Sequence, residues 1–212
     1  MPATRFAVPI ERLSWIAARP GVLVSASAVG YYGDRGDERL TEDSAPGAGY
    51  LAQVCVDWET AAATARSLGV RVCILRTGVV LDRSGGALAK MLPPFRLGIG
   101  GPVAGGHQYI SWISVEDLAA LYLAALDDPR FDGPLNATAP RPVTNAVFAK
   151  ALGRALHRPA VAPVPAAAIR LLFGEMAEIV TDSQNALPAR ALAMGHEFVH
   201  PELEPALAAA LR

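Results

Sequence analysis

The sequence is poor in cysteine and shows no grouping of histidines. Cys55 and Cys73 are the 2 cysteines among 212 residues, no Cys-x-x-Cys pair occurs, and no cluster of His ligands accompanies them. Zinc sites and disulfide frameworks need more ligands than this, at closer spacing. We therefore expect no metal site. Two buried thiols in a reducing compartment are the expected state, and a single disulfide is the alternative.

Charge of one sign and long apolar runs are missing as well. The 19 Lys and Arg residues nearly balance the 20 Asp and Glu residues, and no basic run could neutralise a row of phosphates. Charged residues, Pro or Gly interrupt every apolar stretch before the roughly 18 to 20 residues that a membrane helix needs. The apolar N-terminus contains Glu11 and Arg12, unlike a signal peptide. We expect a cytoplasmic protein that binds a small molecule and neither nucleic acid nor membrane.

The sequence does have enough apolar residues to bury a core. Hydrophobic residues make up 52% of the chain, which argues against disorder. Residues 22–27 form an apolar run without alternation, as in a strand buried on both faces of a parallel sheet. Residues 50–68 have helical periodicity and end at Gly69, a typical helix C-cap, and residues 70–81 are rich in β-branched side chains. Strand, helix and strand at this spacing predict a βαβ unit and a parallel sheet.

Local signals predict the other elements. Ser114 and Thr144 occupy N-cap positions and predict helices that run to residues 126 and 156. Apolar periodicity predicts a helix over residues 4–18. The remaining expected elements are a helix over 87–92, strands over 108–113 and 134–138, and a helical tail after the proline-rich link 157–165.

Two serine hydroxyls stand where open α/β sheets bind ligands. Ser25 and Ser27 come at the carboxyl end of the strand over 22–27, before a loop that carries Tyr31 and Tyr32. Ligands bind beyond the carboxyl ends of parallel strands. A functional role for the serines is one interpretation, and strand-end hydroxyls that bond the local backbone are the other.

Several motifs resemble a known superfamily. The run Ser-Ala-Ser-Ala-Val-Gly-Tyr-Tyr-Gly from Ser25 is similar to the Ser-Ser-x-x-Val-Tyr-Gly segment of extended short-chain dehydrogenases/reductases. Arg76 ending Val-Cys-Ile-Leu-Arg, the run Trp-Ile-Ser-Val-Glu-Asp-Leu from Trp112, and Leu-Asn-Ala-Thr from Leu135 follow in that superfamily's order. Leu-Thr-Glu-Asp-Ser, Asn-Ala-Thr-Ala-Pro and Gly-Glu-Met-Ala-Glu resemble more closely its NAD-dependent epimerase/dehydratase family, in the subgroup with a C-terminal domain of unknown function.

The resemblance, which begins at about residue 4, implies an α/β fold. We expect part of a doubly wound, Rossmann-like parallel sheet with a small, α-rich C-terminal lobe on the substrate side. Residues 1–135 would belong to the dinucleotide-binding domain, with a substrate-side insertion at about 83–109, and residues 136–212 would form the lobe. The helices over 4–18 and 50–68 would pair across the two-fold axis of a homodimer.

The resemblance also implies catalytic roles. In the superfamily a Tyr-x-x-x-Lys pair transfers a proton, and the Lys lowers the pKa of the Tyr. The corresponding positions here are Tyr50 and Val54. An isolated phenol, with a pKa of about 10, is a poor base at pH 7. We expect Ser27 to orient the substrate oxygen and Tyr50 to donate a proton; packing at the helix start is the alternative for Tyr50.

The expected cofactor is NADP or NAD, and the expected substrate is a small molecule. The resemblance assigns Ser25, Arg76, Thr77 and Gly78 to the cofactor. The residues that it places on the substrate side are Tyr31, Tyr32, His107, Gln108 and Trp112.

Three further patterns each allow two interpretations. The glycine-rich stretch 98–106 lacks the preceding strand and internal helix start of a dinucleotide fingerprint, so it is either a loop near the substrate or a plain surface turn. Arg35 follows Tyr31 by four residues, but both lie in a loop, which favours coincidence over a Tyr-cation pair. Glu175 and Glu178 are either substrate-side residues or, as favoured, a solvated helix face.

In the intact family a first βαβαβ half, with a pyrophosphate-binding glycine loop, precedes the region that this chain resembles. About 80 residues of that kind would come before residue 1. Without them we expect one edge of the strand over 22–27 to lack a partner. We also expect residues 1–212 alone to bind NAD(P)H weakly or not at all.

The implied function is that of an NAD(P)-dependent epimerase, dehydratase or reductase that acts on a sugar nucleotide or a similar polar substrate. One alternative, favoured by Val54, is a non-catalytic NADP(H)-binding or regulatory module; turnover by the cofactor-bound protein would separate it from the enzyme. A second alternative is an inactive remnant or interaction protein, which would fold without binding any dinucleotide.

Overall fold

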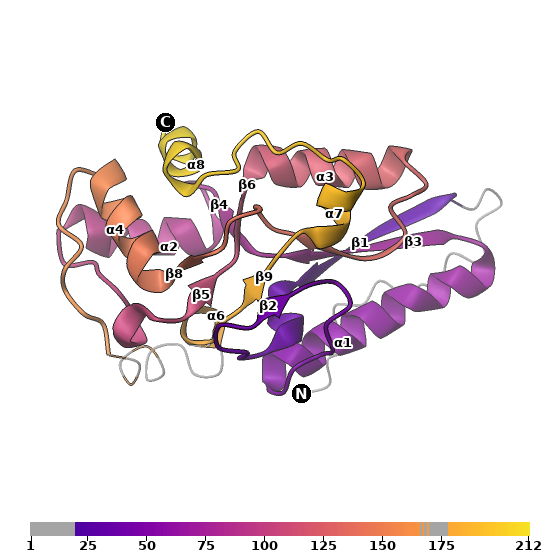
Figure 1. Cartoon of the computed structure of the whole chain (residues 1–212), viewed down its shortest axis with the longest axis horizontal. Helices are drawn as coiled ribbons and strands as arrows, with labels where there is room; N and C mark the ends of the chain where they lie inside the picture. Colours follow the sequence, from indigo (N-terminus) through magenta and orange to yellow (C-terminus); the bar gives the residue numbers. More distant parts are fainter. Residues whose placement is uncertain (1–19, 166, 168, 170–177) are drawn as a thin grey trace.

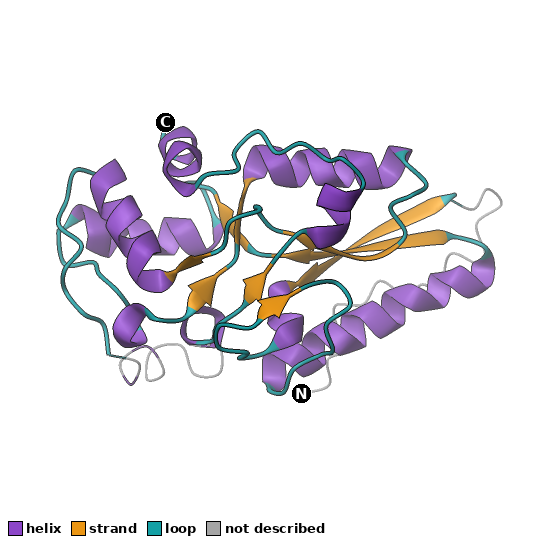
Figure 2. Cartoon of the chain, in the orientation of Figure 1, coloured by secondary structure: helices purple, strands orange, loops and turns teal. Residues whose placement is uncertain are grey.

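The computed structural model describes residues 20–165, 167, 169 and 178–212. Its centre is a three-stranded parallel sheet, with helices on both faces (Figure 1 and Figure 2). The structure is therefore α/β and Rossmann-like, as predicted. The strands lie in the order β1 (Val22–Ala28), β3 (Arg71–Thr77) and β7 (Gly133–Ala137).

The predicted βαβ unit consists of β1, α1 (Tyr50–Ala63) and β3. A 3-10 helix, η4 (Thr64–Leu68), extends α1 to Gly69, whose φ of 77° suits glycine. α1 covers one face of the sheet, and α3 (Val115–Asp127) covers the other (Figure 1). The core between the sheet and the helical segment of α1 and η4 includes Ala62, Ala65, Val72 and Ile74, and the core between the sheet and α3 includes Leu75, Leu121 and Leu135.

Over the described residues, one edge of β1 pairs with no strand. In the part of the chain that the structure describes, β1 pairs in parallel with β3 and with no second strand. This agrees with the expectation for the strand over 22–27.

Two strands that the sequence predicts as continuous are each divided. The breaks, at Gly78 and Ser111, lie against each other: a Cβ on Gly78 would come 2.5 Å from the Ser111 carbonyl oxygen. That oxygen accepts the N–H of Val79 at 2.7 Å. Glycine at position 78 thus lets the chain leave the main sheet where it passes Ser111. The resulting pieces are β4 (Val79–Leu81), which pairs with β6 (Trp112–Ser114), and β5 (Tyr109–Ile110), which pairs with β8 (Val143–Thr144).

The helices α3 and α4 (Asn145–Ala155) begin where their caps predict. The Ser114 hydroxyl accepts the N–H of Asp117 at 3.0 Å, and the Thr144 hydroxyl accepts that of Val147 at 3.4 Å. Each cap satisfies a backbone donor that the first helical turn leaves free.

A second core lies beside the sheet, between α2 (Gly86–Arg96), α4 and α8 (Leu203–Ala210). α2 continues through Pro93 and Pro94, past the predicted end at residue 92. The prolines occupy its last turns, where each removes a single donor, and the buried Phe95 anchors this end in the core. Buried members of this core include Leu88, Phe95, Phe148, Leu152 and Leu207.

Residues 178–186 come back to the loop after β1, and we call them the C-terminal return. β9 (Asn185–Ala186) pairs with β2 (Arg39–Leu40). Ser183 N–H donates to the Asp34 carboxylate at 3.1 Å, and the Asn185 side chain donates to the Asp37 carbonyl at 3.1 Å. These contacts therefore hold residues 183–186 against the loop after β1. The remaining elements are η3 (Val29–Tyr32), η5 (Ala104–Gly106), α6 (Glu178–Thr181) and α7 (Ala189–Ala193).

Some predictions fall outside the described residues. The helix over 4–18 does, so the homodimer that would use it stays a prediction. Residue 175 of the Gly-Glu-Met-Ala-Glu motif also falls outside the described residues. Cys55 and Cys73 are both buried and free, as expected. Over the described ranges, no helix is long and apolar enough to cross a membrane, and no three His, Cys, Asp or Glu residues are grouped as metal ligands would be.

Candidate functional site

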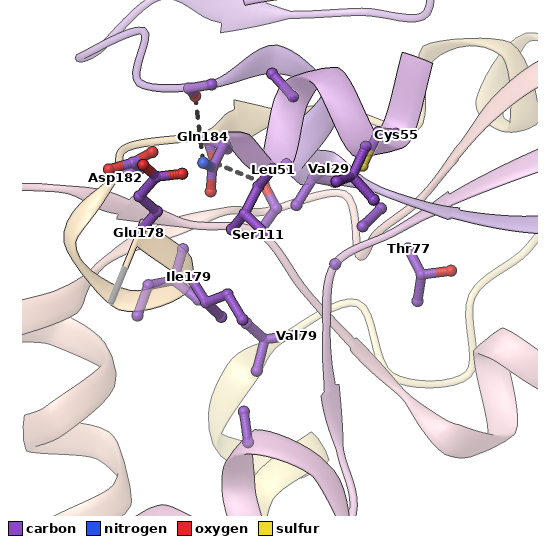
Figure 3. A pocket seen from close by; sticks show the side chains of 18 of the residues that line it. Val29, Leu51, Cys55, Thr77, Val79, Ser111, Glu178, Ile179, Asp182 and Gln184 are labelled. Carbon is purple, nitrogen blue, oxygen red and sulfur yellow. Dashed lines mark hydrogen bonds between the residues drawn. The ribbon is translucent and has the colours of Figure 1, made fainter. Parts of the chain in front are cut away.

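A cavity of about 380 Å³ lies beyond the carboxyl ends of β1 and β3. We refer to it as the first cavity. Thr77 and Gly78, both predicted to contact the cofactor, lie in its wall. The N-terminal half of α1 contributes Leu51, Val54 and Cys55, and the C-terminal return contributes Glu178, Asp182 and Gln184 (Figure 3).

The C-terminal return and Ser111 contribute polar side chains to the wall of the first cavity. The Ser111 hydroxyl donates to the Gln184 carbonyl at 2.7 Å, and the Gln184 side chain donates to the Gly33 carbonyl at 3.2 Å (Figure 3). Asp182 follows Glu178 by one helical turn, and its N–H donates to the Glu178 carbonyl at 3.0 Å. Among the described residues of this wall, none is Lys, Arg or His. The described polar part of the wall therefore includes the carboxylates of Glu178 and Asp182.

Ser27, Glu59 and Arg76 form a buried ionic cluster next to this wall. The Ser27 hydroxyl donates to Glu59 Oε1 at 2.8 Å, so it does not bond the local backbone. Arg76 donates to the same carboxylate from Nε at 2.9 Å and from Nη2 at 2.8 Å. Burial lowers the pKa of Arg76, but the hydrogen bonds with Glu59 and the contact with Tyr32 outweigh burial and raise that pKa. Ser27 and Arg76 are buried and do not line the cavity.

Arg76 also contacts both tyrosines after β1. Its guanidinium carbon lies 3.5 Å from the centroid of the Tyr31 ring. The hydroxyl of the fully buried Tyr32 accepts from Arg76 Nη1 at 3.0 Å. Burial raises the pKa of Tyr32, and Arg76 opposes this effect. Arg35 pairs instead with Glu38, so the cation beside Tyr31 is Arg76.

Tyr50 and Val54, on successive turns of α1, differ in exposure. Tyr50 is the first residue of α1 and is 54% exposed, outside the cavity wall. Val54 lines the cavity where the superfamily pattern has a Lys. The carboxylate of Glu178 lies beside Gly49, the N-cap of α1. A Cβ added to Gly49 would come 3.5 Å from Glu178 Oε2. An acid thus occupies the start of α1, where a helix favours negative charge.

The other predicted site residues lie away from the first cavity. The Ser25 hydroxyl is 3.5 Å from the neighbouring backbone carbonyl, which agrees with the local interpretation for this serine. Trp112 is fully buried, and its indole N–H donates to a backbone carbonyl at 3.0 Å. The Gln108 side chain donates to two backbone carbonyls at 3.1 and 2.9 Å, and His107 is exposed. Contacts of these residues with a ligand stay predictions.

Gly30, Gly33 and Gly36 have the three-residue spacing of a pyrophosphate-binding loop and directly follow β1. In the structure a short 3-10 helix and an irregular loop follow, and α1 begins only at Tyr50. A pyrophosphate site needs the free N–H groups of a helix that starts within the loop. This spacing is therefore no dinucleotide fingerprint.

A second cavity, of about 540 Å³, lies between α2, the glycine-rich stretch and α4. Gly100 and Gly101 line it and are packed closely: a Cβ on Gly101 would come 2.1 Å from the Ala162 carbonyl oxygen. The stretch 98–106 is thus a cavity-lining loop rather than a plain surface turn. The wall residues that the two cavities share are Val79, Gly86, Ala87, Ile110 and Ile179.

Comparison with known sequences decides the family. The NAD dependent epimerase/dehydratase family matches residues 4–137, more than half of the chain. The chain belongs to that family. A domain of unknown function matches residues 164–210, so the epimerase subgroup that the motifs indicate is confirmed too.

Relatives of this epimerase-family chain are longer than the chain itself. An epimerase family protein of Mycobacterium bovis is 46% identical over 202 residues, which are 94% of this chain and 67% of the relative. The human epimerase family protein SDR39U1, solved with NADPH, superposes with a TM-score of 0.88 at 35% identity, over 96% of this chain and 70% of that one. A nucleoside-diphosphate sugar epimerase from Corynebacterium glutamicum does so with 0.75 at 38% identity, over 95% and 40%. The chain spans about two thirds of the mycobacterial relative.

Sequence reasoning missed several wall residues of the epimerase-family site. Ser111, Asp182 and Gln184 carry no local signal, because their positions depend on the break at Gly78 and on the C-terminal return. Glu178 lies in a motif that resembles the subgroup, although its sequence context favours a solvated helix face. The structure places Glu178 in the cavity wall, and its role there stays a prediction.

Proposed function

We propose that the protein holds the nicotinamide end of NADP(H) or NAD(H) in the first cavity and catalyses hydride transfer to or from a carbonyl or alcohol carbon. The position of the cavity carries this proposal, because open α/β sheets bind ligands beyond the carboxyl ends of their strands. Membership of the family and the human relative solved with NADPH support it.

The described wall suits an uncharged ring. Val29, Thr77 and Val79 offer largely apolar surface, and the described lining contains no cation that could pair with phosphates. The wall therefore fits the nicotinamide and leaves the pyrophosphate without a partner in the described residues. A dihydronicotinamide bound there supplies a hydride to a carbonyl carbon, while its oxidised form accepts one from an alcohol.

The resemblance implies that Tyr50 donates the proton that the substrate oxygen needs and that Ser27 orients that oxygen; neither side chain lines the first cavity in this structure, so both roles require the substrate to reach beyond the described wall. Arg76 acts as a positioning residue, because its guanidinium holds Glu59 and thereby the Ser27 hydroxyl. Glu178 joins the site as a carboxylate beside the start of α1.

The resemblance implies a sugar nucleotide or similar polar substrate, and the Corynebacterium relative bears such a name. A diphosphate prefers cationic partners. The described wall of the first cavity offers the carboxylate of Glu178 instead. We therefore restrict the proposed reaction to a carbonyl or alcohol group and leave the diphosphate out.

Fluorescence titration of the 212-residue chain tests the proposal. NADPH and reduced nicotinamide mononucleotide should both give a weak, saturable change, because the shared nicotinamide provides the contacts. Thr77→Asp should weaken binding about tenfold, equivalent to about 1.4 kcal/mol of repulsion and desolvation. Thr60→Asp, at an exposed α1 position outside the wall, should not. A folded chain that gives no change with either nucleotide at millimolar concentration would exclude the proposal.

One observation favours a second function, a non-catalytic NADP(H)-binding module. Val54 occupies the position at which the superfamily has the Lys that activates its Tyr. A panel of ketones, aldehydes and alcohols, assayed by NADPH or NADP absorbance, separates the two functions. Cofactor binding without any turnover would favour the module.

A further inference from the structure

The second cavity has an almost entirely apolar wall. Among the described residues that line it, Lys90 and Asn145 have the only polar side chains. Lys90 is exposed, and the buried Asn145 accepts the N–H of Val103 through its side-chain oxygen at 2.8 Å. Most side chains of the described wall thus offer a ligand no hydrogen-bond partner. A sugar hydroxyl placed there would lose its bonds to water, which costs free energy, whereas an alkyl group gains it.

Close packing of the glycine-rich stretch shapes this cavity. A Cβ on Gly100 would come 2.5 Å from the ring of Phe95, and one on Gly101 would come 2.1 Å from the Ala162 carbonyl oxygen. Larger residues would displace the backbone from both contacts. The shape of the second cavity is therefore determined by the closely packed backbone at Gly100 and Gly101 as well as by side chains.

The second cavity adjoins the place where the proposed reaction occurs. It shares Val79, Ile110 and Ile179 with the first cavity, together with the start of α2 at Gly86 and Ala87. Each cavity falls in the size range of small-molecule sites. One molecule can thus keep its reacting group near Thr77 and extend its remainder past Ile179.

We infer that the second cavity receives the uncharged, aliphatic arm of the substrate, so that the substrate class is an apolar ketone, aldehyde or alcohol rather than a sugar nucleotide. This inference rests on the proposed function for the reacting group, but the binding of the arm does not depend on a cofactor. The carboxylate of Glu178 acts in the same direction, because it disfavours an anionic substrate at the first cavity.

Displacement of an apolar fluorophore measures the arm directly. N-phenyl-1-naphthylamine should bind the 212-residue chain saturably, and a series from 2-hexanone to 2-decanone should displace it. Each added methylene should strengthen displacement about fourfold until the chamber is filled, which is the equivalent of about 0.8 kcal/mol per buried methylene. UDP-glucose should not displace the probe. The absence of saturable binding, displacement by UDP-glucose, or no dependence on chain length would each overturn the inference.

Two exposed residues of one loop give a matched pair of variants. Ile99 is 61% exposed and lines the second cavity, whereas Leu97 is 75% exposed and lies outside its described lining. Ile99→Asp should weaken 2-decanone at least about tenfold, since a carboxylate enters the apolar wall. Leu97→Asp should leave it unchanged. Equal effects of the two variants would overturn the inference, and their exposure makes both compatible with folding.

The readouts keep this inference separate from the proposed function. NADPH titration reports the first cavity, and ketone displacement without cofactor reports the second. Ketone binding with no response to either reduced nucleotide would support the apolar chamber while excluding the proposed function. A nucleotide response without ketone binding would support the proposed function and overturn the inference about the second cavity.

Discussion

The guanidinium of Arg76 holds the carboxylate of Glu59 through two parallel hydrogen bonds, and the same carboxylate accepts the hydroxyl proton of Ser27. The two ionic side chains are only 4% and 12% exposed. Glu59→Ala should therefore lower the free energy of unfolding by about 3–5 kcal/mol, because it leaves a buried guanidinium without its counterion. Urea unfolding measures this loss.

The exposed pair Arg35–Glu38 is the control for that prediction. Glu38 is 50% exposed, so Glu38→Ala should cost about 0–1 kcal/mol. Equal losses for the two variants would show that the buried cluster contributes no more than a surface ion pair.

Gly78→Ala should destabilise the fold by about 1–3 kcal/mol, since overpacking at a close contact costs this much. The new Cβ would come 2.5 Å from the Ser111 carbonyl oxygen. At Gly85 a Cβ meets no atom within 4 Å, so Gly85→Ala should leave the melting temperature nearly unchanged. If Gly78→Ala melts like the parent protein, the strands do not cross as closely as described.

Val54→Lys should shift the pH dependence of any redox turnover to lower pH, because an ammonium one helical turn from Tyr50 stabilises its phenolate. Adding Tyr50→Phe to this variant should abolish the shift. Initial rates from pH 6 to 10 measure it. A profile that ignores both substitutions would remove Tyr50 from the mechanism.

Cys55 and Cys73 should resist a thiol reagent such as 5,5'-dithiobis(2-nitrobenzoate) at pH 8 until the protein unfolds. Burial raises the pKa of both thiols, that of Cys73 to about 11. Reaction requires the thiolate, which burial disfavours. Rapid labelling of either thiol in the native protein would contradict this prediction.

The raised pKa of the Cys73 thiol also predicts how its contribution to the free energy of unfolding changes with pH. The folded state holds the proton more tightly than the unfolded state, whose cysteine pKa is about 8.5. The contribution is therefore present below about pH 8.5 and is lost as the pH rises toward 11. Urea midpoints between pH 7 and 10 should fall less in Cys73→Ala than in the parent protein. Identical slopes would count against the shift.

Local patterns predict the parts of this fold that local physics determines. Ser114 and Thr144 each cap a helix with a side chain that accepts the N–H three residues later, and Gly69 ends the helical segment through its own φ. The divided strands could not be predicted in this way, because the break at Gly78 depends on contact with Ser111.

The same distinction applies to the candidate site. The resemblance assigns Thr77 and Gly78 to the cofactor, and the structure places both in the wall of the first cavity. Arg76, next to them, has its donors directed at Glu59 and Tyr32, a buried arrangement that no linear motif reveals. Gln184 reaches the cavity only through the folded return of the chain.

That return has a consequence for synthesis. Gly33 and Asp34 are made early, but their partners Gln184 and Ser183 follow 151 and 149 residues later. Contacts so distant along the chain form late, since a long loop must first close. On the ribosome the sheet can therefore assemble while the first cavity still lacks a wall. Binding competence should appear only when residues 183–185 have left the exit tunnel, well after the protein already resembles its finished fold.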